Sequence, residues 1–244
     1  MIQASAASPA QALAMVERRL AGEPIEVVVG WAGFCGLRIA LRPGVFVPRR
    51  RTELLAGQAA ALAAPGMVVV DLCCGSGAIA AAIAESLLPH RCDLWAADVD
   101  PVATECAGRN LERYGARVVT GDLFAALPET LRARVDLLVG NVPYVPTAAI
   151  AALPAEARKH EPREALDGGA DGLHVLRRMV SAAPDWLRPG GTLLSEVAAE
   201  QVAAAVAVMR RGGLQVGIAH DPDRDATVVS GASVGLDLGD RPLP

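Results

Sequence analysis

The sequence predicts an α/β protein built on a doubly wound, mostly parallel sheet. Apolar runs typical of buried strands alternate with Ala- and Leu-rich segments typical of helices over residues 67–211. A glycine-rich turn separates the first such strand from its helix, as in sheets that bind ligands at their carboxyl edge. Two β runs close the pattern without a helix between them, so we expect the last strand to be antiparallel, at or near the edge.

The N-terminal region is expected to hold one helix and a β-hairpin. Ser8 precedes Pro9, which is typical of a capped helix start, and Gly22 closes that segment. The β-rich runs 25–29 and 37–41 predict the hairpin. The expected units are a helix with hairpin over residues 1–50, a main domain over 51–234 and a tail over 235–244.

The main domain is expected to begin with a helix over residues 53–64 that Thr52 caps. Further helices are expected over residues 78–87, 101–114 with Asp100 as cap, 172–187 and 199–211. Strands are expected over residues 67–72, 94–98, 118–120, 135–139, 192–197, 215–219 and 227–230.

Composition limits the classes of function. The 244 residues are 52% hydrophobic but only 3% aromatic, which predicts a large aliphatic core. The net charge is -4 and Lys159 is the only lysine, so we expect no nucleic-acid partner. Five cysteines without a C-x-x-C pair indicate neither a disulfide framework nor a metal site, and favour the cytoplasm. No apolar stretch is long enough to predict a membrane span.

The turn over residues 71–78, Asp-Leu-Cys-Cys-Gly-Ser-Gly-Ala, predicts a ligand site. It follows a buried strand and opens a helix, where glycine lets a ligand approach the backbone and the helix N-terminus. We expect Cys73, Gly75, Ser76 and Gly77 to contact that ligand. A tight turn without any ligand would need the same glycines, so this motif alone is weak.

Acidic residues at successive strand ends strengthen the prediction. Asp98 ends the second strand, where a carboxylate can accept both hydroxyls of a ribose. Asp122 follows the third strand and is placed to contact an adenine edge, through its carboxylate or the neighbouring backbone at Leu123. Asp71 either holds the amino-acid end of a ligand or tethers the loop. Each carboxylate alone would also fit a cap or a solvated turn.

The segment after the strand at 135–139 predicts an active-site loop. Asn141 and Tyr144 stand in a turn stiffened by Pro143. The amide side chain, the backbone carbonyl of Val142 and the aromatic ring can converge on one small polar group. An amino or amide nitrogen suits those acceptors.

Together these motifs resemble those of class I S-adenosylmethionine-dependent methyltransferases, and within them the HemK-type protein glutamine methyltransferases, which act on peptide chain release factors. The match covers residues 25–233. Its most specific parts are Asn-x-Pro-Tyr at 141–144 and Glu-Pro-x-x-Ala-Leu-Asp-Gly-Gly at 161–169. The resemblance implies a seven-stranded sheet with the last strand antiparallel. It also implies S-adenosylmethionine as cofactor and a protein partner whose accessible glutamine enters beside Asn141.

The resemblance also implies a catalytic set, which comprises Asn141, Val142, Pro143 and Tyr144. The chain departs from the family pattern at Val142, where proline is usual, and at Cys73 and Cys74, where glycine and a small residue are usual. Residues 1–24 precede the hairpin, where the family usually carries a full helical domain. Alternatives therefore stay open: methylation of a nucleobase amino group, methylation of a small amide or amine, or a cofactor-binding scaffold without turnover.

Overall fold

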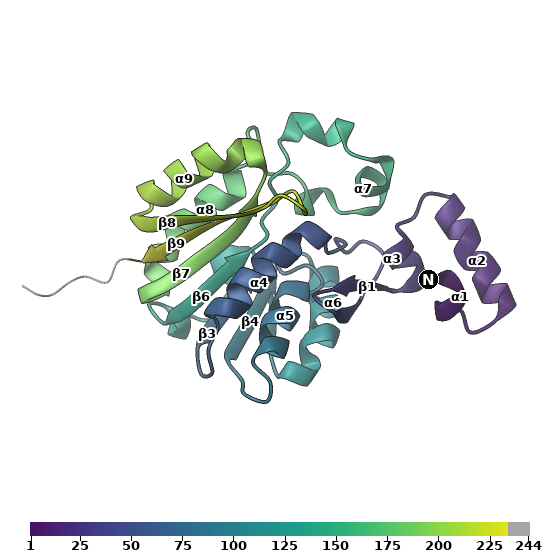
Figure 1. Ribbon diagram of the computed structural model, residues 1–244, viewed down its shortest axis with the longest axis horizontal. Helices are drawn as coiled ribbons and strands as arrows, with labels where there is room; N and C mark the ends of the chain where they lie inside the picture. Colours follow the sequence, from purple (N-terminus) through teal and green to yellow (C-terminus); the bar gives the residue numbers. More distant parts are fainter. Residues whose placement is uncertain (234–244) are drawn as a thin grey trace, which may run out of the picture.

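A seven-stranded sheet forms the centre of residues 1–233, the part of the chain that this computed structural model describes (Figure 1). Its strand order is β5-β4-β3-β6-β7-β9-β8. Strands β3 to β7 run parallel, whereas β9 is antiparallel to both β7 and β8. The strands are β3 (Val68–Leu72), β4 (Asp93–Asp98), β5 (Arg117–Thr120), β6 (Val135–Gly140), β7 (Leu187–Val197), β8 (Leu214–Asp221) and β9 (Ala226–Ser233). The predicted fold class is confirmed, with β8 at the edge and β9 one strand inside it.

Helices cover both faces of the sheet (Figure 1). Val70 and Leu72 of β3 pack on the face of α8 and α9, whereas Val69 packs on the face of α4, α5 and α6. Side chains alternate along a strand, so a strand buried on both faces is apolar throughout. These helices are α4 (Glu53–Leu62), α5 (Ala78–Ser86), α6 (Pro101–Leu111), α8 (His174–Trp186) and α9 (Val202–Arg211).

Two of the three predicted helix caps are confirmed. The Ser8 hydroxyl accepts a backbone N–H of α2 (Pro9–Leu20) at 3.2 Å, and the Asp100 carboxylate accepts one of α6 at 2.8 Å. The predicted Thr52 cap is wrong. Thr52 ends a 3₁₀ turn (Arg50–Thr52) in helical conformation and makes no capping hydrogen bond, since a capping side chain requires an extended backbone at its own position.

The predicted first strand of the hairpin is also wrong. Residues 25–29 form the short helix α3 (Ile25–Val29), which ends at Gly30 with a left-handed φ of 82°. The hairpin pairs β1 (Trp31–Phe34) with β2 (Leu37–Ala40). All three valines of α3 are buried, so tertiary packing outweighs the strand preference of β-branched residues.

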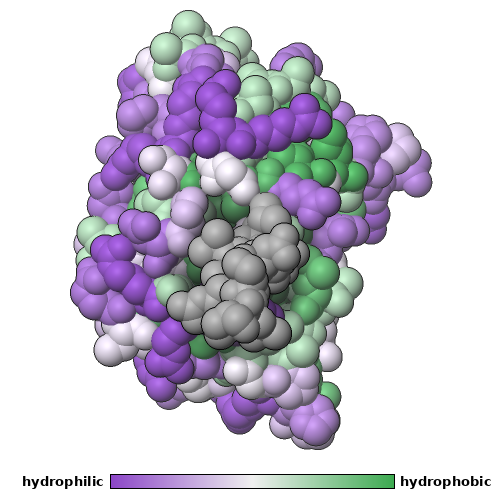
Figure 2. All heavy atoms as spheres, turned by 90° about the vertical axis from the view of Figure 1, so that its left-hand side faces the viewer, coloured by the Kyte–Doolittle hydropathy of each residue, from purple (hydrophilic) through white to green (hydrophobic). Residues whose placement is uncertain are grey.

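Helices α1 (Ile2–Ser5) and α2 extend from the sheet at the right of Figure 1. The α2 residues Leu13 and Leu20 are 62% and 82% exposed. At the opposite end, Figure 2 shows hydrophilic and hydrophobic residues side by side. No helix within residues 1–233 has the length and apolar character of a membrane span. The expected tail, 235–244, lies outside the described residues, and the division at residue 50 stays a prediction.

Candidate active site

A cavity of about 1020 Å³ opens at the carboxyl edge of the sheet. Leu72 at the end of β3 pairs with Ala97 of β4 and with Gly140 of β6, so the segments after these strands begin side by side. All three segments contribute to the cavity wall, with Cys73, Cys74, Gly75, Ser76, Asp98, Val99, Asp100, Asn141, Val142, Pro143, Tyr144 and Val145. The loops singled out in the sequence therefore meet around one space.

The glycine-rich loop lines this cavity and has a backbone conformation that glycine favours. Cys73, Gly75 and Gly77 have left-handed φ values of 57°, 54° and 77°. The Asn110 side-chain nitrogen donates to the Ser76 carbonyl at 2.8 Å and anchors the middle of the loop. A Cβ at Gly77 would lie 3.0 Å from a leucine side chain, so glycine there serves close packing on α6.

Asp98 lines the cavity beside this loop. Its carboxylate accepts the Gly75 N–H at 2.8 Å and the Asp100 N–H at 3.0 Å. Burial raises the pKa of Asp98 above its ordinary value. A carboxylate offers roughly four acceptor positions, so two stay open for a ligand's hydroxyl groups.

Four of the expected cofactor residues do not line the cavity: Asp71, Gly77, Asp122 and Leu123. Asp71 is fully buried, and its Oδ2 accepts the Ala80 N–H of α5 at 3.2 Å. Burial raises the pKa of Asp71 to about 7. Asp71 is therefore placed as a tether between β3 and α5, the second of its two predicted roles. Asp122 pairs instead with Arg178 of α8 at 2.6 Å.

Asn141 lines the cavity and carries an acceptor that no donor in the described residues uses. Its Oδ1 is buried and has no hydrogen-bond partner among the described residues. Its Nδ2 lies 3.5 Å from the Thr52 hydroxyl, a long contact that orients the amide. Within residues 1–233 no donor bonds to the Val142 carbonyl oxygen either. Two acceptor oxygens of consecutive lining residues are thus without a donor in the described residues.

Gln201 holds this loop in place. Its Nε2 donates to the Tyr144 carbonyl at 2.8 Å and to the Asp171 carbonyl at 3.1 Å. Gly172 permits this contact, since a Cβ there would lie 2.2 Å from both Nε2 and the Tyr144 oxygen. The Asp-Gly-Gly segment packs in the same way, because a Cβ at Gly168 would lie 2.7 Å from the Pro143 oxygen.

Two ion pairs join the cavity wall to the segment after the hairpin. Glu161 accepts both Arg49 Nη2, at 2.6 Å, and the Val47 N–H, at 3.3 Å. Glu196 accepts a hydrogen bond from the Tyr144 hydroxyl at 2.8 Å and forms an ion pair with Arg51, whose Nε lies 3.2 Å from Oε1. The sequence did not assign a partner to either glutamate, because these contacts join residues far apart in the chain.

The cysteine pair in the loop has the character of small apolar residues. Burial raises the pKa of the Cys73 and Cys74 thiols well above the ordinary value, so both stay protonated. No group of three or more His, Cys, Asp or Glu side chains within residues 1–233 is arranged to hold a metal ion.

The chain is similar to known methyltransferases. A methyltransferase-domain family model matches residues 69–160. The release factor glutamine methyltransferase of Geobacter sulfurreducens is 41% identical over 220 residues, which is 89% of this chain and 76% of that protein. The 4-amino-L-phenylalanine/4-methylamino-L-phenylalanine methyltransferase of Streptomyces pristinaespiralis is 40% identical over 207 residues, 81% of this chain and 69% of that protein.

A solved structure supports the fold. The crystal structure of a methyltransferase from Pyrococcus furiosus superposes with a TM-score of 0.59 at 20% identity, over 90% of this chain and 98% of the other.

Proposed function

The chain belongs to the family of the release factor glutamine methyltransferases, and from this premise we propose that it methylates the side-chain amide nitrogen of a protein glutamine. S-adenosylmethionine would supply the methyl group, and a peptide chain release factor would supply the glutamine. The family resemblance in the Asn-x-Pro-Tyr and Asp-Gly-Gly motifs supports both assignments.

The unpartnered Oδ1 of Asn141 carries this proposal. A carboxamide nitrogen is a poor nucleophile, because its lone pair is delocalised into the carbonyl group. If Asn141 Oδ1 and the Val142 carbonyl each accept one N–H, the nitrogen is held with its lone pair directed at the methyl donor. The same oxygens face the positive charge that develops on nitrogen during transfer, and they need no reorganisation to stabilise it.

The residues of the glycine-rich loop fit S-adenosylmethionine. Asp98 retains acceptor positions for the ribose hydroxyls, and Gly75 and Ser76 line the same cavity without bulky side chains. When bound, this cofactor supplies a methyl group activated by a sulfonium. The cavity of about 1020 Å³ is at the upper end of the range for small-molecule sites, so it has space for a substrate side chain beside a cofactor.

Methyl transfer from labelled S-adenosylmethionine to a purified release factor tests the proposal. We expect label in the wild-type release factor and none when the glutamine of its Gly-Gly-Gln motif is replaced. The Asn141→Ala enzyme serves as the control for site-dependent transfer. Label that persists without that glutamine would contradict the substrate assignment.

A small aromatic amine is the second candidate substrate, because the Streptomyces relative named for 4-amino-L-phenylalanine is as similar as several glutamine methyltransferases. The two acceptor oxygens at Asn141 and Val142 would hold an aryl amine by the same hydrogen bonds. Transfer to 4-amino-L-phenylalanine, measured beside transfer to the release factor, separates the two substrates. Faster turnover of the amine would favour the second candidate.

A further inference from the structure

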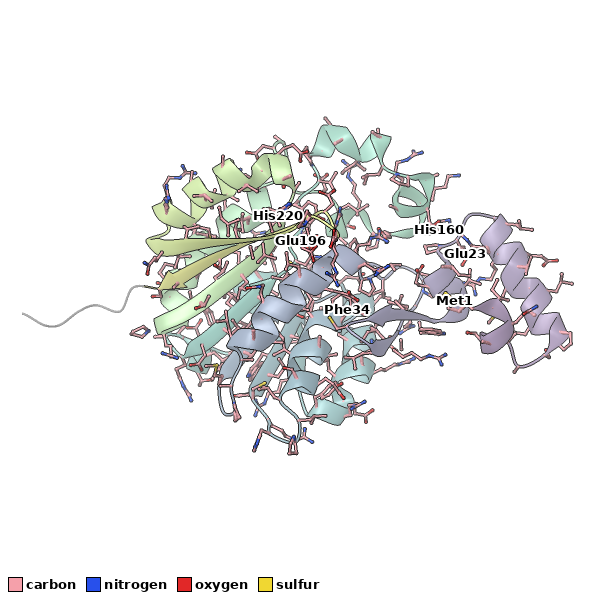
Figure 3. All side chains as sticks on the ribbon, viewed as in Figure 1. Met1, Glu23, Phe34, His160, Glu196 and His220 are labelled. Carbon is pink, nitrogen blue, oxygen red and sulfur yellow. The ribbon has the colours of Figure 1, made fainter. Side chains whose placement is uncertain are left out.

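Glu196 is a buried carboxylate at the carboxyl end of β7 for which the proposed reaction has no direct use. Its side chain is 2% exposed. Figure 3 shows it in the interior of the molecule, close to α4. Removing a carboxylate from water costs several kcal/mol unless partners compensate for the lost hydration, so its contacts indicate why it is tolerated.

Two other elements supply partners to Glu196 Oε1, whereas Oε2 has no hydrogen-bond partner in the described residues. Tyr144 in the loop after β6 donates its hydroxyl at 2.8 Å, and Arg51 in the turn before α4 places Nε at 3.2 Å. The Arg51 guanidinium also lies 5.5 Å from the centre of the Tyr144 ring. Arg51 and Tyr144 line the cavity, whereas Glu196 does not. Glu196 can therefore reach a substrate only through these two residues.

A second trio of the same residue types lies on the surface and provides a comparison. The Tyr114 hydroxyl donates to Glu85 at 2.5 Å, Arg113 pairs with Glu85 at 2.8 Å, and Arg113 lies 4.9 Å from the Tyr114 ring centre. There, Arg113 and Glu85 are 62% and 36% exposed. At the other trio Arg51 is 42% exposed but Glu196 is only 2% exposed, so the two trios differ chiefly in the burial of the glutamate. Solvent screens an exposed pair more strongly than one with a buried partner.

We propose that Arg51 and Glu196 are positioning residues that fix the Tyr144 ring in the cavity wall next to Asn141, an inference that rests on the proposed methyl transfer. The buried Glu196 carboxylate, paired with the partly exposed Arg51, anchors the hydroxyl end of the ring. The ring then keeps its place beside the acceptor oxygens of Asn141 and Val142 and excludes water from them. Gln201 holds the backbone of the same residue, so Tyr144 is fixed at both ends.

Steady-state methyl transfer to the release factor tests this arrangement. Tyr144→Phe and Glu196→Gln should each lower kcat by about tenfold, because displacement of a positioning group by less than 1 Å costs up to about a hundredfold. The double variant should fall no further than either single variant, because both changes release the same ring. Arg51→Met should lower kcat to the same extent as Glu196→Gln, whereas Arg51→Lys should keep most of the wild-type kcat. The Kd for S-adenosylmethionine should stay unchanged in all of these variants.

The surface trio supplies the matched control. Arg113→Met removes the corresponding arginine at Tyr114 and should leave kcat unchanged. Arg51→Met leaves Glu196 without its cation and could unfold the protein. Arg51→Met combined with Glu196→Gln removes both charges and leaves no buried carboxylate without a cation. This double variant should therefore fold, and its kcat tests the same arrangement.

A readout independent of activity uses the two tyrosines of the chain, Tyr114 and Tyr144. With ¹³C at the ring Cζ, the protein gives two resonances, which Tyr114→Phe assigns. Glu196→Gln and Arg51→Met should each shift the Tyr144 resonance and leave that of Tyr114 in place. This spectrum still tests the arrangement if the release factor proves not to be the substrate.

Two results would overturn the inference. The first is a double variant in which the kcat losses of Tyr144→Phe and Glu196→Gln multiply, because the two residues would then act separately. The second is an unshifted Tyr144 resonance in both charge variants.

Discussion

Replacement of Asn141 by alanine removes one preorganised acceptor from the candidate site and very little else. Within residues 1–233 the Asn141 side chain makes one hydrogen bond, the 3.5 Å contact with Thr52, which is too long to contribute much stability. Its Oδ1 is already unpartnered, so no buried donor is left unsatisfied by the change. We therefore expect the free energy of unfolding to change by less than about 1 kcal/mol.

The effect on catalysis should be much larger. Loss of one preorganised polar group at a developing charge lowers kcat by about 10² to 10³, equivalent to roughly 3–4 kcal/mol of transition-state stabilisation. Single-turnover transfer from labelled S-adenosylmethionine measures this rate without a contribution from product release. Calorimetry of cofactor binding should give an unchanged Kd, because Asp98 and the glycine-rich loop are intact.

Two further variants refine this test. Asn141→Asp keeps an acceptor oxygen and should retain more activity than alanine. Asn110→Ala instead removes the anchor of the Ser76 carbonyl, so it should weaken cofactor binding more than it slows transfer from the bound cofactor. A kcat for Asn141→Ala within about threefold of wild type would refute the acceptor mechanism.

Three more predictions concern the cofactor loop, the loop support and pH. Asp98→Ala removes a charged acceptor, so cofactor binding should weaken by roughly tenfold or more; an unchanged Kd by calorimetry would contradict the ribose assignment. Gly172→Ala places a Cβ 2.2 Å from the Gln201 side chain, so the free energy of unfolding in urea should fall by about 2 kcal/mol or more. Gly108→Ala is the control, because a Cβ there meets nothing within 4 Å and should not destabilise the protein. Burial raises the pKa of Asp71 from 3.8 to about 7. Above pH 3.8 the unfolded chain therefore loses this proton while the folded protein keeps it, so the free energy of unfolding decreases as the pH rises. The decrease is on the order of 4 kcal/mol and is complete at about pH 7. The urea-derived free energy of unfolding should therefore fall between about pH 4 and pH 7, and Asp71→Asn should flatten that profile.

Several features of this protein could be predicted from local sequence. The buried strand ending at Leu72 and the helix after it are encoded by neighbouring residues, so alternation of apolar runs predicted the sheet. The position of Asn141 after a central strand also follows from the order of the strands. Parallel strands bring their carboxyl ends to one edge, and for this reason Asn141 and Asp98 line one cavity. Their roles toward a ligand stay predictions.

Other features depended on contacts that no local pattern reveals. Residues 25–29 carry a strand-like composition, but the buried environment of their valines favours helix α3. Asp122 follows a strand as expected, but its carboxylate forms an ion pair with Arg178 of α8. Thr52 has the residue type of a cap, but its backbone conformation places the hydroxyl beside Asn141, 89 residues away in the chain.

The sequence by itself determined the order of the sheet elements, the glycine-rich loop and the Asn-x-Pro-Tyr turn, because each of these depends on residues only a few positions apart. Only the tertiary structure decided which side chains support them. Tyr144 and Glu196 are 52 residues apart, and Arg51 comes from a third element, so their contact exists only once the strands and helices have packed. The physical reason is that the partner of a buried charge is set by the topology of the whole fold, whereas a turn is set by the conformational limits of its own residues.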